Sequence, residues 1–244
     1  MPKDSGAKGE EGAKITVTKN GPYFVSGAVP LFPMIIECDG HGIPTKWLKG
    51  KNLQTKQNYI LCRCGQSSTK PFCDGTHVKV NFDGTETSEN EPFESMAEEL
   101  IGPELKLKDA VMLCASARFC HRDGDIWDVI HHTNVAEAKK NVIENSCDCP
   151  SGRLVAYDKR TGKAIEPTLE KSIGPIEDPS KGVSGPFWVR GGIPLYSADG
   201  KLYEGRNRVT LCRCGKSANK PFCDSSHYPE EEDREPKREV KENE

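Results

Sequence analysis

The amino-acid sequence predicts an α+β, mostly β protein in which two copies of one small β domain flank a small α/β insert. The first observation is a repeated stretch of 16 residues: CRCGQSSTKPFCDGTH at Cys62–His77 returns as CRCGKSANKPFCDSSH at Cys212–His227. The second is a repeat further upstream, where GPYFVSGAVPLF at 21–32 returns as GPFWVRGGIPLY at 185–196. The third is a helical hydrophobic pattern between the two copies. The duplication is therefore of domain size.

The repeats and the composition of the two ends predict the domain boundaries. Both ends are charged and nearly free of large apolar side chains, so they gain too little burial to offset the entropy lost on ordering. The predicted segments are a disordered tail at 1–13, a first repeat domain at 14–90, a middle segment at 91–168, a second repeat domain at 169–228 and a disordered charged tail at 229–244.

Each repeat domain is expected to consist of short strands around Gly and Pro turns. A strand at Tyr59–Leu61 and its counterpart at Val209–Leu211 lead into the first cysteines. The copies are 164 residues apart upstream but 150 apart at the cysteines, so the first copy carries 14 additional residues, which we place within Met34–Lys56.

The middle segment has its own pattern. Apolar residues between Ile126 and Ile143 recur at helical spacing. After them, two short strand patterns at Arg153–Asp158 and Lys163–Ile165 are separated by a Lys-Arg-Thr-Gly turn. We therefore expect a helix followed by a β-hairpin.

Composition and charge exclude several classes of protein. The formal net charge is −3 and the body between the charged ends is near neutral, which does not fit a nucleic-acid-binding protein. The longest nearly apolar run, Ala28–Ile36, has nine residues, whereas a membrane-spanning helix needs roughly 20. The first residues lack the apolar stretch of a secretory signal. The expectation is a cytoplasmic protein with no membrane contact.

Cysteine is the strongest signal in the composition. Eleven cysteines in a chain without a secretion signal indicate metal ligation or redox chemistry rather than a disulfide framework. Cys38 stands alone and is expected to be an ordinary packed or surface thiol. The other ten form three groups: Cys62, Cys64 and Cys73; Cys114, Cys120, Cys147 and Cys149; and Cys212, Cys214 and Cys223.

The first and last groups share the spacing C-x-C-x8-C-x3-H. Gly65 supplies a turn after the first two cysteines, and Pro71 suits the first turn of a helix. Such a helix would place Cys73 and His77 on one face. Three thiolates and one imidazole suit zinc or an iron-sulfur cluster, and the spacing alone does not separate the two, although C-x-C is atypical of structural zinc sites.

The two repeated stretches resemble the signature of a known family. Cys62–His77 fits, position by position, the signature C-x-C-x2-[S/T]-x3-P-x-C-D-G-[S/A/T]-H of the CDGSH iron-sulfur (mitoNEET-like) family. The second copy keeps every ligand but has Ser225 in place of the family's glycine. The resemblance implies that two such repeats form an intrachain pseudo-dimer.

The resemblance also implies two 2Fe-2S clusters, with each C-x-C pair on an inner iron and each Cys/His pair on an outer iron. The implied ligands are Cys62, Cys64, Cys73 and His77 in the first copy and Cys212, Cys214, Cys223 and His227 in the second. An imidazole in place of a thiolate removes one negative charge and raises the reduction potential. Imidazole also competes for protons, so acidification should release the clusters and reduction should be coupled to proton uptake.

The middle cysteines are candidates for a third metal or cluster site. They are Cys114, Cys120, Cys147 and Cys149. The C-x5-C spacing followed by Cys-Pro resembles the divergent ferredoxin-like segment that accompanies CDGSH repeats in some proteins. It departs from the C-x2-C-x2-C spacing of ordinary ferredoxins. Buried structural thiols are the alternative interpretation.

Three functions follow as hypotheses. The first is an electron carrier or redox and pH sensor with two 2Fe-2S clusters, and the second is a protein that transfers its clusters to apo-acceptor proteins. The third is a zinc-binding interaction module. The sequence contains no phosphate-binding glycine loop, nucleophile elbow or H-E-x-x-H helix, so we do not expect an enzyme. The expected partner is a redox protein or an apo-acceptor, and the expected form is a monomer with internal pseudo-twofold symmetry.

Overall fold

The computed structural model describes residues 12–228. The predicted disordered tails therefore lie outside the described residues, apart from the last two residues of the first tail. Of these, Ala13 packs against the main hydrophobic core. No helix within 12–228 is long and apolar enough to cross a membrane.

The described residues form three β-sheets and a few short helices, as expected for an α+β, mostly β fold. The strands of the two repeat domains are β1 (Lys14–Val17), β2 (Tyr23–Ser26), β3 (Met34–Cys38), β4 (Pro44–Lys49), β5 (Tyr59–Leu61), β10 (Ser172–Asp178), β11 (Val183–Arg190), β12 (Leu195–Tyr196) and β13 (Arg208–Leu211). The strands of the middle segment are β6 (Glu98–Ile101), β7 (Leu105–Asp109), β8 (Leu154–Asp158) and β9 (Ala164–Ile165).

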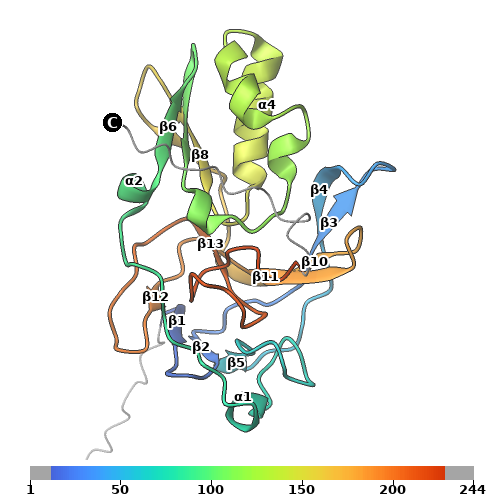
Figure 1. Ribbon diagram of the computed structural model, residues 1–244, viewed down its shortest axis with the longest axis vertical. Coiled ribbons are helices and arrows are strands. Elements are labelled where there is room, and N and C mark those ends of the chain that lie inside the picture. The colour runs from blue at the N-terminus through green and yellow to red at the C-terminus, as the bar shows by residue number, and fades with distance from the viewer. Residues whose placement is uncertain (1–11, 229–244) are drawn as a thin grey trace, which may run out of the picture.

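The helices are short except for one in the middle segment. The α-helices are α1 (Thr76–Lys79), α2 (Phe93–Met96), α3 (Ile126–Val129) and α4 (Ala136–Asp148). Three 3-10 turns, η1 (Val111–Leu113), η2 (Phe119–His121) and η3 (Ile130–His132), accompany them. In Figure 1, β6, β8 and α4 of the middle segment stand at one end, β1, β2 and β5 lie at the other, and β10, β11 and β13 lie between.

The two repeat domains exchange a strand. The first sheet has the order β12-β1-β2-β5 and the second has the order β13-β11-β10-β3-β4. In the first, β12 of the second repeat pairs in parallel with β1, and in the second, β3 of the first repeat pairs in parallel with β10. Because each sheet is completed by the other repeat, the copies form one intertwined unit with internal pseudo-twofold symmetry.

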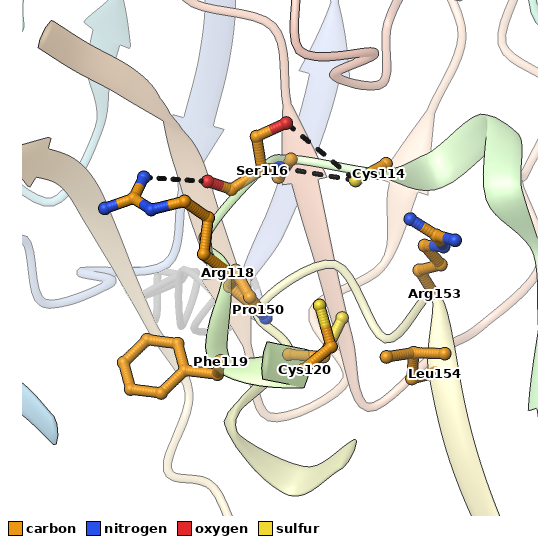
Figure 2. Close-up of a pocket in the computed structure, with 11 residues that line it drawn as sticks. Cys114, Ser116, Arg118, Phe119, Cys120, Pro150, Arg153 and Leu154 are labelled. Atoms are coloured by element: carbon orange, nitrogen blue, oxygen red, sulfur yellow. Dashed lines mark hydrogen bonds between the residues drawn. The ribbon is translucent and has the colours of Figure 1, made fainter. Parts of the chain in front are cut away.

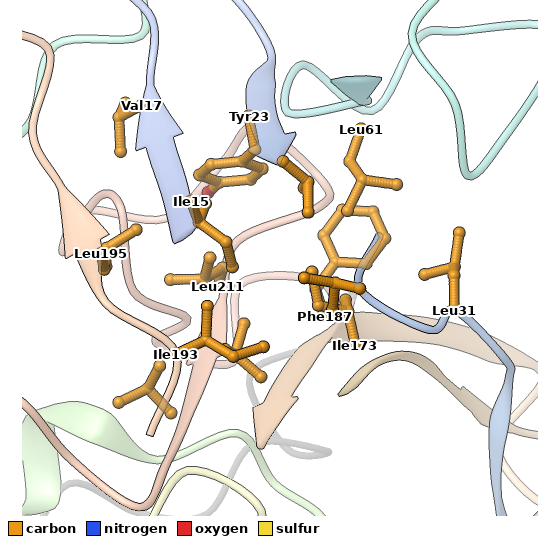
Figure 3. Close-up of a cluster of buried hydrophobic side chains, with 14 of the residues drawn as sticks. Ile15, Val17, Tyr23, Leu31, Leu61, Ile173, Phe187, Ile193, Leu195 and Leu211 are labelled. Carbon is orange, nitrogen blue, oxygen red and sulfur yellow. The ribbon is translucent and has the colours of Figure 1, made fainter. Parts of the chain in front are cut away.

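The main core lies between these two sheets. Tyr23 and Phe187, which occupy the same position in the two repeats, meet edge to face with ring centroids 6.2 Å apart. Figure 3 shows the two rings among apolar side chains of both repeats. Two equivalent residues can touch only close to the axis that relates them. The pseudo-twofold axis therefore passes through this core.

The additional residues of the first copy form the hairpin of β3 and β4, within the range that the sequence predicts. The second copy instead closes with a tight turn, in which Leu202 bridges to Tyr196. On the hairpin, the Trp47 ring lies 4.9 Å from that of Phe119 and 4.8 Å from that of Trp188. The hairpin thus joins the middle segment to the second repeat.

The middle segment is a small α/β unit with the sheet order β6-β7-β8-β9. Leu105 and Leu107 of β7 pack with Ile126 of α3 and Val142 of α4 in one buried cluster. The predicted hairpin is confirmed as β8 and β9, and the helical pattern is confirmed as α3, η3 and α4.

Candidate metal centres

The first two cysteines of the first repeat are placed by β5, which ends at Leu61. Cys62 and Cys64 are buried, and their Sγ atoms are 3.8 Å apart. A tetrahedral metal with metal–sulfur bonds of about 2.3 Å spaces its sulfur ligands about 3.8 Å apart. The pair is therefore spaced to share one metal.

The other two ligands form a second pair. The Cys73 Sγ and the His77 Nδ1 are 3.3 Å apart, close to the separation that one tetrahedral metal imposes on a sulfur and a nitrogen ligand. The prediction that both residues lie on one helical face is wrong, because α1 begins only at Thr76. Phe72 instead bridges to Leu61, and the Cys73 amide donates to the carbonyl of Ile60 at 3.1 Å.

A tight turn holds the Cys/His pair in place. The Asp74 carboxylate accepts hydrogen bonds from the Ser68 amide at 2.8 Å, the Ser68 hydroxyl at 2.7 Å and the Thr76 amide at 3.0 Å. These donors hold the pKa of Asp74 well below its usual range. The aspartate of the motif is thus a structural residue that remains ionised.

Backbone amides point at the sulfur atoms. The Gln66 amide lies 3.5 Å from the Cys64 Sγ, and the Gly75 amide lies 3.4 Å from the Cys73 Sγ. Burial raises the pKa of both thiols. A bound metal cation would reverse that effect and hold the sulfurs as thiolates, with the amides stabilising their charge.

The second repeat reproduces this geometry. The Sγ atoms of Cys212 and Cys214 are 3.8 Å apart, and the Cys223 Sγ is 3.5 Å from the His227 Nδ1. The amides two residues beyond Cys214 and Cys223 again point at the sulfurs, at 3.5 and 3.4 Å. We call the two four-ligand sites, Cys62/Cys64/Cys73/His77 and Cys212/Cys214/Cys223/His227, the first and second cage.

The two pairs of each cage do not converge on one point. Within residues 12–228, no three His, Cys, Asp or Glu side chains come close enough together to hold a single metal ion. A structural zinc ion needs its four ligands around one centre. Two pairs, each spaced for one metal, instead suit a cluster of two metals with two protein ligands on each.

The cages touch each other at their glycines. Gly65 and Gly215 have φ angles of +74° and +80°, a conformation that favours glycine. A β-carbon on Gly65 would collide with the carbonyl oxygen of Cys214, and one on Gly215 would lie 2.6 Å from the carbonyl oxygen of Cys64. The two C-x-C turns therefore meet back to back.

The residue between the two cysteines is a buried arginine in both cages, which sequence reasoning missed. Arg63 donates to the carbonyl of Thr18 at 3.1 Å and also to that of Gly84. Arg213 donates to the carbonyl of Ile176 at 3.1 Å and to the Glu177 carboxylate at 2.9 Å. Each guanidinium ties its cage to neighbouring backbone and places a positive charge beside it. The arginine recurs between the two cysteines of both repeated stretches, and this recurrence could have identified it from the sequence.

The cages differ next to their Cys/His pairs, at the side that we call the outer edge. The Ser225 hydroxyl, in the second cage, donates to the carbonyl of Cys114 at 2.9 Å and accepts from the Ser116 hydroxyl at 2.7 Å. Ser225 has a φ of +72°, like Gly75 at +85° in the first cage. A β-carbon at Gly75 would have no neighbour within 4 Å. The serine that departs from the family signature thus keeps the local backbone conformation and makes a contact with the middle segment.

Three of the four middle cysteines line one cavity: Cys114, Cys120 and Cys149 (Figure 2). The structure separates Cys147 from them. Its Sγ lies 3.8 Å from the carbonyl of Ile165, because it sits in the last turn of α4 and faces β9. The four-cysteine site suggested by the sequence is therefore reduced to three cysteines.

Arginine side chains line this cavity or lie beside it. Arg153 lines it and donates to both carboxylate oxygens of Asp109, at 2.5 and 2.9 Å. Arg208, 1% exposed, donates to the carbonyl of Cys149 at 2.8 Å, and Arg206 donates to that of Gly152. Arg153 and Arg208 are themselves paired with Asp109 and Glu166, so the feature that fits an iron-sulfur cluster is the set of three cysteine sulfurs in one cavity.

Comparison with protein families agrees with this geometry. A family described as an iron-binding zinc finger of CDGSH type matches residues 20–78 and 184–228, which include both cages. A family described as a divergent 4Fe-4S mono-cluster matches residues 100–159, which include the three cavity cysteines. No curated protein matches the chain. The chain is therefore an iron-sulfur protein with two iron-binding CDGSH-type domains and a divergent 4Fe-4S domain between them.

Proposed function

We propose that each cage holds one 2Fe-2S cluster and that the protein transfers single electrons. The observation that carries this proposal is the arrangement of each cage as two pairs, with sulfurs 3.8 Å apart in one pair and sulfur and nitrogen 3.3 or 3.5 Å apart in the other. When bound, such a cluster supplies reversible one-electron chemistry. The residues of the chain decide its charge, its access to solvent and its contact with a partner.

The histidines set the charge of each cage. Their Nδ1 atoms face Cys73 and Cys223, so a neutral imidazole takes the place of a fourth thiolate. One less negative charge favours the reduced state and raises the reduction potential relative to a four-cysteine site. This suits a carrier that accepts electrons from low-potential donors.

The contact between the cages supports electron movement within one chain. The Gly65 turn touches Cys214 and the Gly215 turn touches Cys64, with backbone against backbone. Because the exchanged strands complete both sheets within one polypeptide, we propose that a monomer is the working form. A redox partner would dock at the first cage, where Val78 next to the ligand His77 is 69% exposed.

A second candidate function, transfer of a cluster to an apo-acceptor, is favoured at the first cage only. Cys73 and His77 are half-buried at an edge that no other segment of residues 12–228 covers at Gly75. Cys223 is 3% exposed, and its neighbour Ser225 is bonded to the middle segment. His227 is half-buried like His77, so the difference lies at the cysteines of the Cys/His pairs: an acceptor could reach Cys73 of the first cage more easily than Cys223 of the second.

Anaerobic reductive titration followed by visible absorption tests the proposal. Two cages predict uptake of about two electrons per chain in addition to any taken up by the middle site, and reoxidation by an electron acceptor without loss of iron. A His77→Cys variant should take up the same number of electrons at a lower potential. Loss of iron to an apo-ferredoxin acceptor from the oxidised protein would favour cluster transfer. A protein that takes up no electrons at the cages contradicts both functions.

A further inference from the structure

The spacing of the middle cysteines corresponds to a ferredoxin pattern with one cysteine missing. Ferredoxins of the bacterial type space their ligands C-x2-C-x2-C and add a Cys-Pro. Cys114 and Cys120 are separated by five residues, the separation of the first and third cysteines of that pattern, and Cys149 precedes Pro150. The place of the second cysteine is taken by Ala117.

The structure places Ala117 at the same cavity. Ala117, 7% exposed, lines the cavity together with Cys114, Cys120 and Cys149. Ala117 also packs in an apolar cluster that includes Trp188 and the lining residue Phe119. The alanine thus stands at the position of a ligand in register and in space.

No other side chain of the cavity replaces the missing ligand. Its lining contains three cysteines and no His, Asp or Glu, and Cys147 is bound elsewhere at Ile165. The Ser116 hydroxyl, which also lines the cavity, donates to Ser225 at 2.7 Å. The Asp109 carboxylate behind the cavity is held by Arg153 and by the Trp127 indole, which donates at 2.8 Å.

We propose that the middle site holds its cluster by three thiolates and that the corner facing Ala117 is an open coordination site for a small external thiol. The chemistry favours this ligand class, because iron in such clusters prefers soft sulfur donors. Arg153 lines the site and Arg208 lies beside it, paired with Asp109 and Glu166 respectively. Binding would be a ligand exchange: the thiol would lose its proton to solvent, its sulfur would replace a solvent ligand at the corner facing Ala117, and no electron would be transferred. This inference goes beyond electron transfer by the two cages.

The test compares three full-length proteins: wild type, Ala117→Cys and the control Ala115→Cys, which adds a thiol to the same cavity two residues out of register. Each is purified anaerobically without thiols, reduced, and titrated with 2-mercaptoethanol while low-temperature EPR is recorded. We expect a saturable change of the 4Fe-4S spectrum in wild type and in A115C. In A117C the added thiolate already fills the corner, so the spectrum should resist the titration at unchanged iron content.

Several results would overturn the proposal. They are a wild-type spectrum that is unaffected by the thiol, an A117C protein that responds like wild type, and a chain with no iron beyond that of the cages. If A117C does not fold, Ala117→Val keeps the test decisive, because a bulkier apolar group at this corner must weaken thiol binding about tenfold or more. The 2Fe-2S signals in the same samples report on the cages separately, so failure here is distinct from failure of the proposed function.

Discussion

The two cages have the same ligands and the same internal spacing but different surroundings. Their sulfur pairs are both 3.8 Å apart, yet Cys73 is half-buried and Cys223 is 3% exposed. At the outer edge the first cage has Gly75 facing open space, and the second has Ser225 bonded to Cys114 and Ser116 of the middle segment. The motif itself fixes ligand geometry, while distant parts of the chain decide what can reach each cage.

A second difference lies at the axis between the repeats. The Tyr23 hydroxyl donates to the carbonyls of Cys212 at 2.9 Å and Pro221 at 3.1 Å, so it fastens the second cage. Its counterpart Phe187 has no hydroxyl to offer the first cage. Burial raises the pKa of Tyr23 well above its usual value, so the donor persists at any ordinary pH. The second cage is thus the more firmly held of the two.

The largest expected effect comes from separating the cages. Gly215→Val forces a branched side chain against the Cys64 carbonyl in a left-handed conformation. We expect a loss of roughly 2–4 kcal/mol in the unfolding free energy of the apoprotein, measured by urea denaturation, and loss of iron from both cages. The control is Gly162→Ala, where φ is +68° and no atom lies within 4 Å, at a cost of about 1 kcal/mol. Equal costs for the two variants would contradict the back-to-back contact.

The next effect concerns release of a cluster. Incubation of oxidised protein with an apo-ferredoxin should release the first cluster about tenfold faster than the second, since only the first has an open outer edge. His77→Cys should abolish the fast phase, and the matched His227→Cys should leave it intact. A fast phase that disappears in the His227 variant would reverse the assignment of the two cages.

A smaller change makes the two cages more alike at the axis. Tyr23→Phe removes both hydrogen bonds to the second cage and leaves two buried carbonyls without this donor. We expect a loss of about 1–2 kcal/mol in stability and faster release of the second cluster. Phe187→Tyr is the matched control, and it should not loosen the second cage. If the Tyr23 variant releases the second cluster no faster than wild type, the Tyr23 hydroxyl does not hold the second cage.

The smallest effect on stability is expected at Ser225. Ser225→Gly loses the hydrogen bonds to Cys114 and from Ser116, which costs about 1–2 kcal/mol, but relieves a left-handed serine, which returns about 1 kcal/mol. The unfolding free energy should change by less than about 1 kcal/mol, while the second cluster becomes easier to extract. Gly75→Ser is the reverse variant; it has no partner to bind and should only destabilise, by about 1 kcal/mol. If the second cluster of the Ser225→Gly variant is as hard to extract as that of wild type, Ser225 does not cover the second cage.

Much of this arrangement could be predicted from the sequence because it repeats. The two 16-residue stretches locate both sets of ligands, and the difference in their offsets locates the hairpin of β3 and β4. The prediction of a helix at Pro71 was wrong. Pro71–Cys73 runs beside β5, and the Cys62 amide donates to the carbonyl of Pro71 at 2.9 Å. A local propensity for helix gave way to strand pairing.

Other features depend on contacts between distant residues and leave no local pattern. Ser225 and Ser116 are 109 positions apart, so the cover over the second cage could not be read from either segment alone. Cys147 and Cys149 look equivalent in sequence, but the end of α4 between them sends one towards β9 and the other into the cavity. Which of two neighbouring cysteines serves a site is decided by where a helix ends.

The content of iron, sulfide and zinc per chain, measured on anaerobically purified protein together with its visible spectrum, tests the central claim most directly. Two binuclear cages predict at least about four iron and four sulfide per chain, little zinc, and a coloured protein that is bleached by dithionite. Iron and sulfide above that amount would belong to the middle site. About two zinc and no sulfide in a colourless protein would contradict the account and leave a zinc-binding interaction module.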